Sequence, residues 1–277
     1  MKFLHNLTIT DYQDATIHPD DRGYYFGDGI YEVFRIYNGR LFQEDAHLVR
    51  LARSAAELRI PLPYGLPEIT GLMYKLLEED PVEEGILYLQ ITRGAAPRGH
   101  AFPPEGTQPV LTAYCKPLPR NRDKITGGIR IVSVPDIRWL RCDIKTLNLL
   151  GNVLAKQEAV ERGADEAVLH RSGTVTECSS SNIMMVKDGT LWTHPADNLI
   201  LPGITRQVVL EQARTVGIPV QEAVFSLEEL YSADEVLITG TTTEVTPVIL
   251  IDETPIAGGQ PGPITRQLQR EYQTLFM

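Results

Sequence analysis

Lys145 is the residue of this sequence whose side chain could act as a covalent catalyst. It lies between Ile144 and the pair Thr146 and Leu147, so its aliphatic stem has apolar neighbours. Burial among such neighbours would remove hydration and lower a lysine pKa by up to about 3–5 units. A neutral amine is a nucleophile that forms Schiff bases with carbonyl compounds. A lone lysine near a strand end is more often a solvated charge, so this interpretation depends on the rest of the chain.

A second candidate is a pair of hydrogen-bond donors in a loop rich in glycine and proline, residues 94–104. Arg98 and His100 stand one residue apart there. A guanidinium offers a rigid fork of donors that fits a carboxylate, and His100 adds another donor. Exposed arginines and histidines are usually solvated, so the pair alone does not establish an anion site.

Two turns of small residues could bind a phosphate. Residues 201–206 open an expected helix, and the free N–H groups at a helix start bind phosphate readily. Residues 240–244 follow a strand expected at 235–239 and offer N–H and hydroxyl donors. Many helices begin this way without a ligand, and a threonine-rich segment is equally typical of a simple turn.

The elements that would position these residues can be read from periodicity. A β-rich run at residues 30–42 is interrupted by Asn38 and Gly39, which are typical of a type I′ hairpin turn. Alternation along the strand puts Tyr31 and Glu32 on opposite faces. The glycines and aromatic residues of positions 21–29 predict tight turns before this hairpin.

A helix is expected to follow, with Asp45 as its N-cap. Leu48, Leu51 and Ala55 form its apolar stripe, and Arg50 lies off that stripe. The other elements of the first half are expected to be a helix at residues 67–79 and strands at 86–93 and 109–114.

Residues 119–123 are polar, contain proline and lack periodicity, so they predict an interdomain linker. The linker divides the chain into a smaller N-terminal α/β domain, residues 1–118, and a larger C-terminal domain, residues 124–277. Strands and helices alternate in the second half, so the expected fold class is mixed α/β. These are strands at residues 128–134, 166–170, 183–186, 190–193 and 235–239, and helices at 149–162, 204–215 and 264–272.

Composition excludes several classes of protein. A net charge of −10 argues against a nucleic-acid partner, because binding phosphate backbones needs a basic surface. The three cysteines form no motif for a metal or a disulfide framework, and we expect no metal. No signal peptide and no apolar run long enough to cross a bilayer is found, so we expect a cytoplasmic protein without a membrane partner.

Taken in order, the segments of the chain from about residue 20 onward resemble fold type IV pyridoxal-phosphate enzymes, the class IV aminotransferases. Within that class the resemblance is strongest to the D-amino acid aminotransferases. The segments that carry it are residues 21–29, the hairpin 31–42, the loop 97–100, and residues 136–150, 174–182, 203–206 and 241–244. The resemblance implies a two-domain fold and pyridoxal 5′-phosphate as the cofactor.

The resemblance also implies roles for individual residues. Lys145 would form the Schiff base and carry the substrate proton, and Glu177 would pair with the pyridine nitrogen and keep it protonated. Arg50, Thr241 and the N–H groups of Ile204 and Thr205 would hold the phosphate. The remaining contacts to the cofactor ring would come from Ser179, Ser180, Ser181, Asn182 and Leu201.

Substrate recognition follows from the same resemblance. Tyr31, Arg98 and His100 resemble the trap for the substrate α-carboxylate, with Glu32 supporting the site. In the family, Arg98 and His100 reach in from the partner subunit, which implies a homodimer with shared active sites. The implied reaction takes a D-amino acid such as D-alanine and a 2-oxo acid such as 2-oxoglutarate to pyruvate and D-glutamate, by ping-pong kinetics.

Two departures from the family pattern concern substrate range and rate. Gly99 stands where alanine is expected, and Gly240 stands where serine is expected. The alternatives are another fold type IV enzyme (an L-branched-chain aminotransferase, an (R)-amine transaminase or aminodeoxychorismate lyase) or, more remotely, a non-catalytic protein that binds pyridoxal phosphate. The loop at residues 97–100 argues against the other enzymes of this fold.

Overall fold

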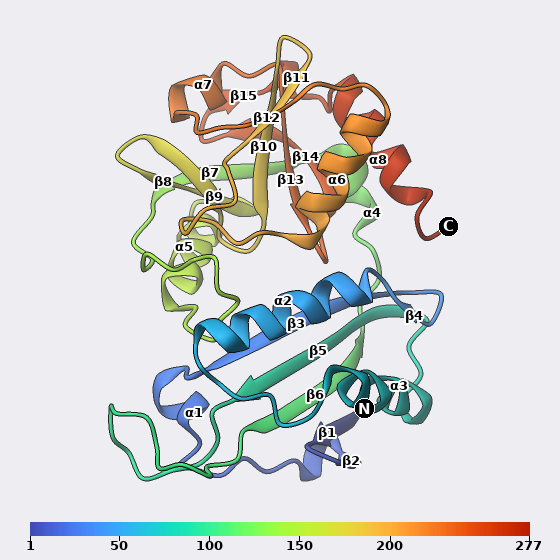
Figure 1. Ribbon diagram of the computed structural model, residues 1–277. Helices are drawn as coiled ribbons and strands as arrows, with labels where there is room; N and C mark the ends of the chain where they lie inside the picture. The colour runs from blue at the N-terminus through green and yellow to red at the C-terminus, as the bar shows by residue number, and fades with distance from the viewer. The chain divides into compact units, whose positions relative to one another are not determined.

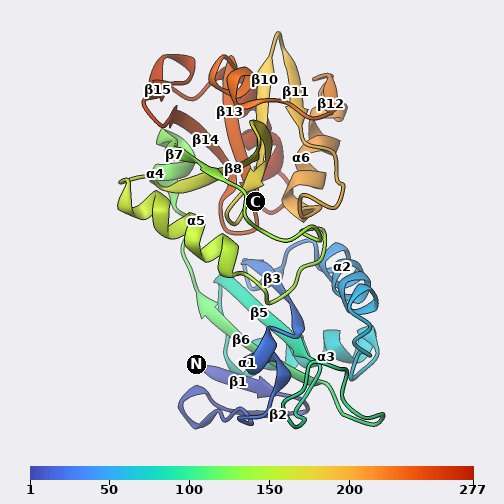
Figure 2. The same cartoon turned by 90° about the vertical axis from the view of Figure 1, so that its left-hand side faces the viewer.

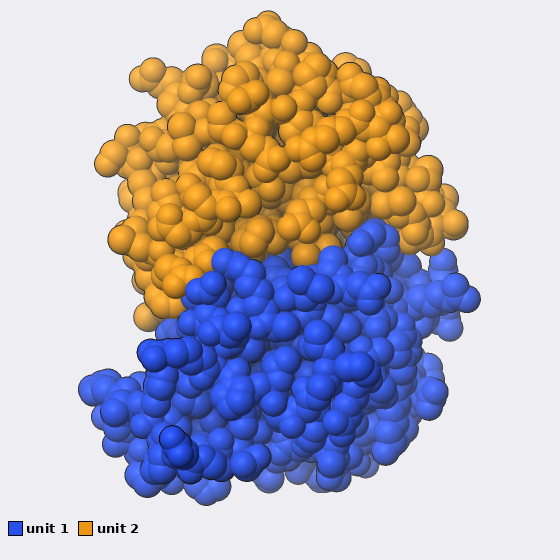
Figure 3. Space-filling view, viewed as in Figure 1, with its two compact units in different colours: residues 1–119, 144–148 blue, residues 120–143, 149–277 orange.

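The computed structural model describes all 277 residues and divides into two compact units. Unit 1 comprises Met1–Pro119 and Ile144–Asn148, and unit 2 comprises Arg120–Asp143 and Leu149–Met277, as coloured in Figure 3. Sequence analysis assigned all of residues 124–277 to one domain, whereas the segment that carries Lys145 packs with unit 1. The chain therefore passes from one unit to the other on both sides of this lysine.

Unit 1 is built on a six-stranded antiparallel sheet with the order β2-β1-β6-β5-β3-β4. Its strands are β1 (Lys2–His5), β2 (Thr8–Asp11), β3 (Gly29–Tyr37), β4 (Arg40–Leu41), β5 (Glu84–Thr92) and β6 (Val110–Pro117). Its helices are α1 (Arg22–Phe26), α2 (Glu44–Glu57) and α3 (Leu66–Glu79), with a 3₁₀ turn, η1 (Tyr12–Asp14).

Helices α2 and α3 cover the same face of this sheet (Figures 1 and 2). The predicted apolar stripe of α2, with Leu51 and Ala55, packs in one core with Met73 of α3 and inward-facing side chains of the strands. The predicted hairpin is confirmed, because β3 and β4 pair antiparallel around Asn38 and Gly39. Both turn residues have positive φ, 51° and 72°, as a type I′ turn requires.

Three local expectations for unit 1 differ from the structure. Residues 21–29, expected to be turns, contain α1, which Asp21 caps by accepting a hydrogen bond from Gly23 N at 2.7 Å. Helix α2 begins at Glu44 after Gln43, so Asp45 lies in its first turn and is not the N-cap. Strands β1 and β2 were not predicted, because four-residue strands are too short to show clear periodicity.

Unit 2 is built on a nine-stranded mixed sheet with the order β12-β11-β10-β13-β14-β7-β8-β9, and β15 pairs with β14. Its strands are β7 (Ile129–Pro135), β8 (Glu166–Arg171), β9 (Thr174–Cys178), β10 (Asn182–Lys187), β11 (Thr190–Thr193), β12 (Val220–Glu222), β13 (Glu235–Gly240), β14 (Glu244–Ile251) and β15 (Thr254–Pro255). Its helices are α4 (Arg122–Gly127), α5 (Leu150–Glu161), α6 (Ile204–Thr215), α7 (Leu227–Tyr231) and α8 (Pro263–Gln273), with a 3₁₀ turn, η2 (Ala257–Gly259).

Helix α5 lies beside β7 and β8 (Figure 2), and its Ala155 and Ala159 pack in one core with side chains of these strands. Helices α6 and α8 pack against β13 and β14. Helix α4 begins at Arg122, inside the segment 119–123 that was expected to be a linker without regular structure. None of the helices combines the length and the hydropathy that a membrane span requires.

Candidate active site

The backbone of Lys145 is fixed by strand-like pairing within unit 1. Tyr31 N donates to Lys145 O at 3.1 Å, and Leu147 N donates to Gly29 O at 3.0 Å. Ile30 and Thr146 face each other as an antiparallel bridge between these two hydrogen bonds. The lysine is therefore held beside the start of β3, which sequence periodicity alone did not reveal.

The side chain of Lys145 is half-buried and lies over an aromatic ring. Its Nζ is 4.2 Å from the ring centroid of Tyr31, and a cation at this distance is stabilised by about 0.5–2 kcal/mol. Tyr31 stacks on Tyr88 at 5.7 Å, and Tyr88 stacks on Tyr114 at 5.3 Å. A row of tyrosines on one face of the sheet thus supports the amine.

Glu32 lies on the opposite face of β3 and is completely buried. Arg50 donates to both of its carboxylate oxygens at 2.8 Å, and His47 Nδ1 is 2.7 Å from one of them. Burial alone would raise the pKa of Glu32, but the charge and hydrogen bonds of Arg50, with His47, bring it to about 2. Burial also lowers the pKa of His47. The buried carboxylate thereby fixes the direction of the Arg50 guanidinium.

Arg98 and His100 lie on an exposed loop of unit 1, and Phe26 brings them together. The Arg98 guanidinium is 5.2 Å from the ring centroid of Phe26, and the His100 ring is 5.6 Å from it. No hydrogen bond, ion pair or ring contact joins either side chain to Tyr31 in this chain. The two predicted donors thus share a contact with Phe26 but have none with the third predicted member of the carboxylate trap.

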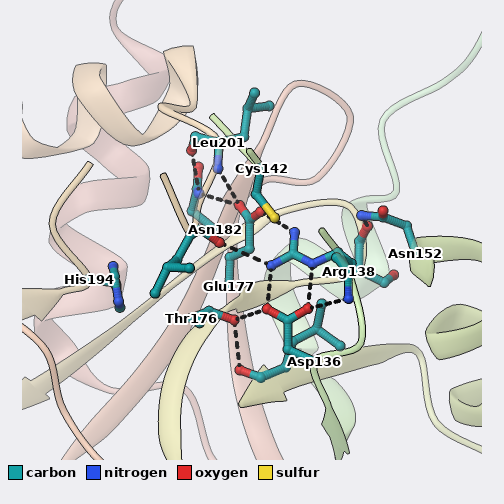
Figure 4. Close-up of polar contacts among 12 residues, drawn as sticks. Asp136, Arg138, Cys142, Asn152, Thr176, Glu177, Asn182, His194 and Leu201 are labelled. Carbon is teal, nitrogen blue, oxygen red and sulfur yellow. Dashed lines mark hydrogen bonds and ion pairs between the residues drawn. The ribbon is translucent and has the colours of Figure 1, made fainter. Parts of the chain in front are cut away.

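Unit 2 holds Glu177, which is buried with 5% of its surface exposed. Its carboxylate accepts hydrogen bonds from Arg138, from Asn182 Nδ2 at 2.9 Å and from Leu201 N at 3.1 Å (Figure 4). Burial raises the pKa of Glu177 to about 7, although the charge of Arg138 and the hydrogen bonds oppose this shift. A further cation placed against this carboxylate would therefore be bound with a gain in free energy.

Arg138 is itself held by a second carboxylate, that of Asp136 (Figure 4). Arg138 Nε and Nη2 each donate to Asp136 at 2.9 Å, and Arg171 Nε and Thr176 Oγ1 donate to the same carboxylate at 3.0 Å. Burial alone would raise the pKa of Asp136, but these hydrogen bonds and the arginine charges bring it to about 2. Sequence analysis missed both residues of this Asp-x-Arg pair, although they follow a buried strand directly.

The serine-rich turn after β9 is tied to a carboxylate that sequence analysis also missed. Ser179 Oγ and Ser180 Oγ both donate to Glu166, the latter at 2.9 Å, and Glu166 is buried. Asn182, at the end of the turn, donates to Leu201 O at 2.9 Å as well as to Glu177. The turn therefore orders the surroundings of Glu177 through Asn182 and is not a solvated loop.

The two turns that could bind a phosphate both approach the first residues of β10. Gly203, the N-cap of α6, has no room for a side chain because a Cβ there would meet Asn182. A Cβ on Gly240 would lie 2.7 Å from Thr243 Oγ1 and 3.5 Å from the Ser181 Cβ. Glycine at position 240, where serine was expected, thus leaves room for Thr243 in this turn.

The same two turns offer donors that fit a phosphate. Thr243 Oγ1 is buried and has no hydrogen-bond partner. The first N–H groups of α6, those of Ile204 and Thr205, lie at a helix start where no intrahelical carbonyl can accept them. A buried hydroxyl without a partner costs free energy unless a ligand satisfies it, so this part of unit 2 suits an anionic group.

Comparison with known proteins agrees with this fold. The family model described as amino-transferase class IV matches residues 29–251, so the chain belongs to the class IV aminotransferase family. Pyridoxal phosphate is the cofactor of this family. Each unit has groups that fit part of it, namely the amine of Lys145 in unit 1, and the buried carboxylate of Glu177 and the phosphate-ready turns in unit 2.

Similarity to individual proteins is also high. The chain is 51% identical over 277 residues to a D-alanine aminotransferase of Listeria monocytogenes, and the aligned region covers 98% of this chain and 95% of the relative. It is 49% identical over 272 residues to a D-alanine aminotransferase of Staphylococcus aureus, covering 98% and 96%. Among solved structures, an Escherichia coli branched-chain amino acid aminotransferase superimposes with a TM-score of 0.95 at 27% identity, covering 100% of this chain and 94% of that one. The mixed α/β class and the fold type IV architecture are thereby confirmed.

Proposed function

We propose that this chain is a D-amino acid aminotransferase that transfers the amino group of D-alanine to 2-oxoglutarate and returns pyruvate and D-glutamate. The observation that carries the substrate assignment is identity of about half the residues, over nearly the whole chain, to proteins named D-alanine aminotransferase. The exposed pair of Arg98 and His100 supports it, because an amino acid substrate presents a carboxylate to bind.

In this proposal Lys145 Nζ attaches the cofactor and, once released, moves the substrate proton. One group must act both as nucleophile and as general base, and an amine can do both. The pairing of the Lys145 backbone with β3 and the Tyr31 ring under Nζ support this role, because they hold the amine in one place. Pyridoxal phosphate, when bound, supplies the carbonyl carbon and the electron-withdrawing ring.

Glu177 is proposed to accept a hydrogen bond from the protonated ring nitrogen of the cofactor. Its raised pKa supports this role, because a buried carboxylate whose charge is only partly compensated gains free energy from an added cation. Asn182 and the Leu201 N–H hold the carboxylate in position. Leu201, Ser180 and Ser181 complete the proposed contacts around the ring.

Arg50, Thr241 and the N–H groups of Ile204 and Thr205 are proposed to hold the cofactor phosphate. The bidentate pairing of Arg50 with Glu32 supports this role, since it restricts the guanidinium to one orientation before a ligand arrives. The α6 N–H groups add a positive partial charge at the helix start.

Tyr31, Arg98 and His100 are proposed to bind the substrate α-carboxylate, with Arg98 and His100 supplied by the partner subunit. The absence of contact between these two residues and Tyr31 within one chain is consistent with that division. A test is Arg98→Leu, which should reduce kcat/KM for D-alanine by at least about tenfold, because a charged hydrogen bond is worth about 1.5–3 kcal/mol. Unchanged kcat/KM for D-alanine would exclude Arg98 from the trap.

The partner is proposed to be a second copy of this chain. Unit 2 exposes large apolar side chains close together in sequence, in the stretch that precedes α5 and in α5 itself. These are Ile137, Trp139, Leu140, Leu150, Val153 and Leu154. A monomer rarely leaves such a patch exposed, so these residues support an interface.

A cytoplasmic location is also proposed. Cys115, Cys142 and Cys178 are all buried and unpaired. Free thiols persist in a reducing compartment, which supports this location.

The assignment is tested with the purified holoenzyme and 2-oxoglutarate by measuring the 2-oxo acid formed from each amino acid, which is pyruvate from either alanine and 4-methyl-2-oxopentanoate from L-leucine. We expect turnover with D-alanine and none with L-alanine or L-leucine. Turnover of L-leucine alone would instead place the chain with the branched-chain enzymes, whose fold it shares.

A further inference from the structure

The loop that carries Arg98 and His100 has little internal order of its own. A side chain at Gly99, between them, would meet only Pro97 O at 4.0 Å, so the glycine is not required by crowding. Glycine widens the conformations open to a loop and raises the entropy lost when the loop is fixed. Contacts from outside the loop must therefore hold Arg98 and His100 in one arrangement.

One such contact comes from Phe26, the last residue of α1. Its half-buried ring lies against three groups that are or can become cationic. The guanidinium of Arg22 is 4.9 Å from the ring centroid, that of Arg98 is 5.2 Å away, and the His100 ring is 5.6 Å away. One aromatic ring therefore touches both predicted carboxylate-binding side chains.

A hydrogen bond holds the loop backbone at the same place. Arg22 Nη1 donates to Gly99 O at 2.7 Å, and Arg22 Nε donates to Asp28 at 2.8 Å. Arg93 Nε donates to the same oxygen of Asp28, also at 2.8 Å. Burial would raise the pKa of Asp28, but the hydrogen bonds of Arg93 and Arg22 hold it below its ordinary value. Asp28 therefore stays charged and fixes both arginines.

The far end of the loop is held by a second aromatic residue, Phe102. The guanidiniums of Arg93 and Arg59 lie over its ring, 3.9 Å and 4.7 Å from the centroid. Arg93 is buried and also donates to the carbonyls of Leu58 and Arg59 at 2.8 Å each. Phe102 thereby packs on two arginines held just after the end of α2, and the loop is anchored on both sides of Arg98 and His100.

We propose that Phe26 and Phe102 are positioning residues that hold the loop so that Arg98 and His100 meet the substrate α-carboxylate together. This inference rests on the proposed function, in which those two side chains bind that carboxylate. It also gives a role to residues 21–29, whose glycines and aromatic residues stood out in the sequence. Asp21, Gly27 and Asp28 shape α1 and its end so that Phe26 and Arg22 face the loop.

The experiment compares Phe26→Leu and Phe102→Leu with the unchanged holoenzyme. Each replacement keeps an apolar side chain but removes the aromatic face that the guanidiniums contact. We expect KM for D-alanine to rise about fivefold in each variant, the effect of losing one or two exposed cation–π contacts. We expect kcat to stay within about twofold, because a loss confined to substrate binding raises KM alone.

A second readout separates loop positioning from a general loss of structure. Propionate carries the carboxylate of D-alanine without its amine, so its inhibition constant against D-alanine should rise by a similar factor. Affinity of the apoprotein for pyridoxal phosphate should not change. Tyr24→Leu is the matched control, because Tyr24 is in the same helix, is 79% exposed and contacts neither Arg98 nor His100.

The possible results decide the inference. Wild-type values of KM and of the propionate inhibition constant in both variants would overturn it. Reduced kcat or cofactor affinity with an unchanged KM would overturn it as well, since that pattern belongs to a structural role. Phe102 is half-exposed, so its variant should fold even if Phe26→Leu does not. If the proposed function is wrong, the wild-type protein will not turn over D-alanine at all, and this result is distinct from an unchanged KM in the two variants.

Discussion

Arg138 donates a hydrogen bond to the Glu177 carboxylate while Asp136 holds the other nitrogens of the same guanidinium. The three side chains form a buried chain of alternating charge in unit 2 (Figure 4). In the proposed function Glu177 meets the ring nitrogen of the cofactor, so Arg138 and Asp136 act on the cofactor only through Glu177. The effect of Arg138 on Glu177 can therefore be measured as a change in the affinity of the protein for the cofactor.

Replacing Arg138 with methionine should weaken the binding of pyridoxal phosphate by about tenfold or more. The change removes a charged hydrogen bond worth about 1.5–3 kcal/mol and a cation that lowers the pKa of Glu177. The pKa of Glu177 would then rise further, so keeping its carboxylate charged against a cationic ring nitrogen would cost more free energy at neutral pH. Titration of the apoprotein with pyridoxal phosphate measures the effect. Arg214→Met, which alters a half-exposed surface arginine of the same unit, should bind as the wild type does; equal affinity in both variants would refute the role of Arg138.

The pH dependence of apoprotein stability should contain a contribution from Glu177. Its pKa is about 7 in the folded protein against 4.5 for the free side chain, so the folded state binds the proton more tightly. The contribution of Glu177 to the free energy of unfolding is therefore fully present below pH 4.5 and is lost as the pH rises through about 7. The free energy of unfolding falls by about 3 kcal/mol over this range. Urea unfolding at pH 5 and pH 8 should show the wild type losing stability relative to Glu177→Gln. Parallel losses in the two proteins would mean that Glu177 does not titrate in this range.

Two replacements of Tyr31 should separate its hydroxyl from its ring. Tyr31→Phe keeps the ring under Lys145 and the stack on Tyr88 but removes the hydroxyl proposed to meet the carboxylate. We expect it to raise KM for D-alanine several-fold with little change in kcat. Tyr31→Leu also removes the ring that positions the amine, so kcat should fall as well, by about threefold or more. Identical kinetics in the two variants would show that the ring does not position Lys145.

A charge in the exposed apolar patch should separate the proposed dimer. Leu154→Lys places an ammonium where the partner would bury an aliphatic side chain, and burying an unpaired charge is costly. Sedimentation velocity should show a dimer for the wild type and a shift toward monomer for the variant. Val224→Lys, at a residue 58% exposed on the same unit, is the control and should remain dimeric. A variant that sediments as the wild type does would place the interface elsewhere.

The sequence predicted those features that depend on local pattern. The hairpin around Asn38 and Gly39 was found because its turn chemistry is local, and α2 was found from the spacing of Leu48, Leu51 and Ala55. Helix α1 was missed because five residues with two glycines nearby carry no helical periodicity. The role of Asp21 as the N-cap of this helix could be found only from the hydrogen bond that it accepts from Gly23 N.

The parts of the site that depend on pairing between distant residues could not be predicted. The bridge between the Lys145 segment and β3 joins residues more than a hundred positions apart, and no local pattern encodes it. Arg138, Asp136 and Glu166 were missed because the residue type of a charged side chain does not show whether that side chain is buried or solvated. Their burial becomes visible only when the partners that neutralise them are in place.

The most direct test of the account is the visible absorbance spectrum of the holoenzyme, recorded before and after D-alanine and, separately, L-alanine. We expect a cofactor band that changes when D-alanine is added without a 2-oxo acid, that does not respond to L-alanine, and that is absent from Lys145→Ala. A band that responds only to an L-amino acid would contradict the proposed substrate. A protein that shows no such band even after addition of pyridoxal phosphate would contradict the role of Lys145 itself.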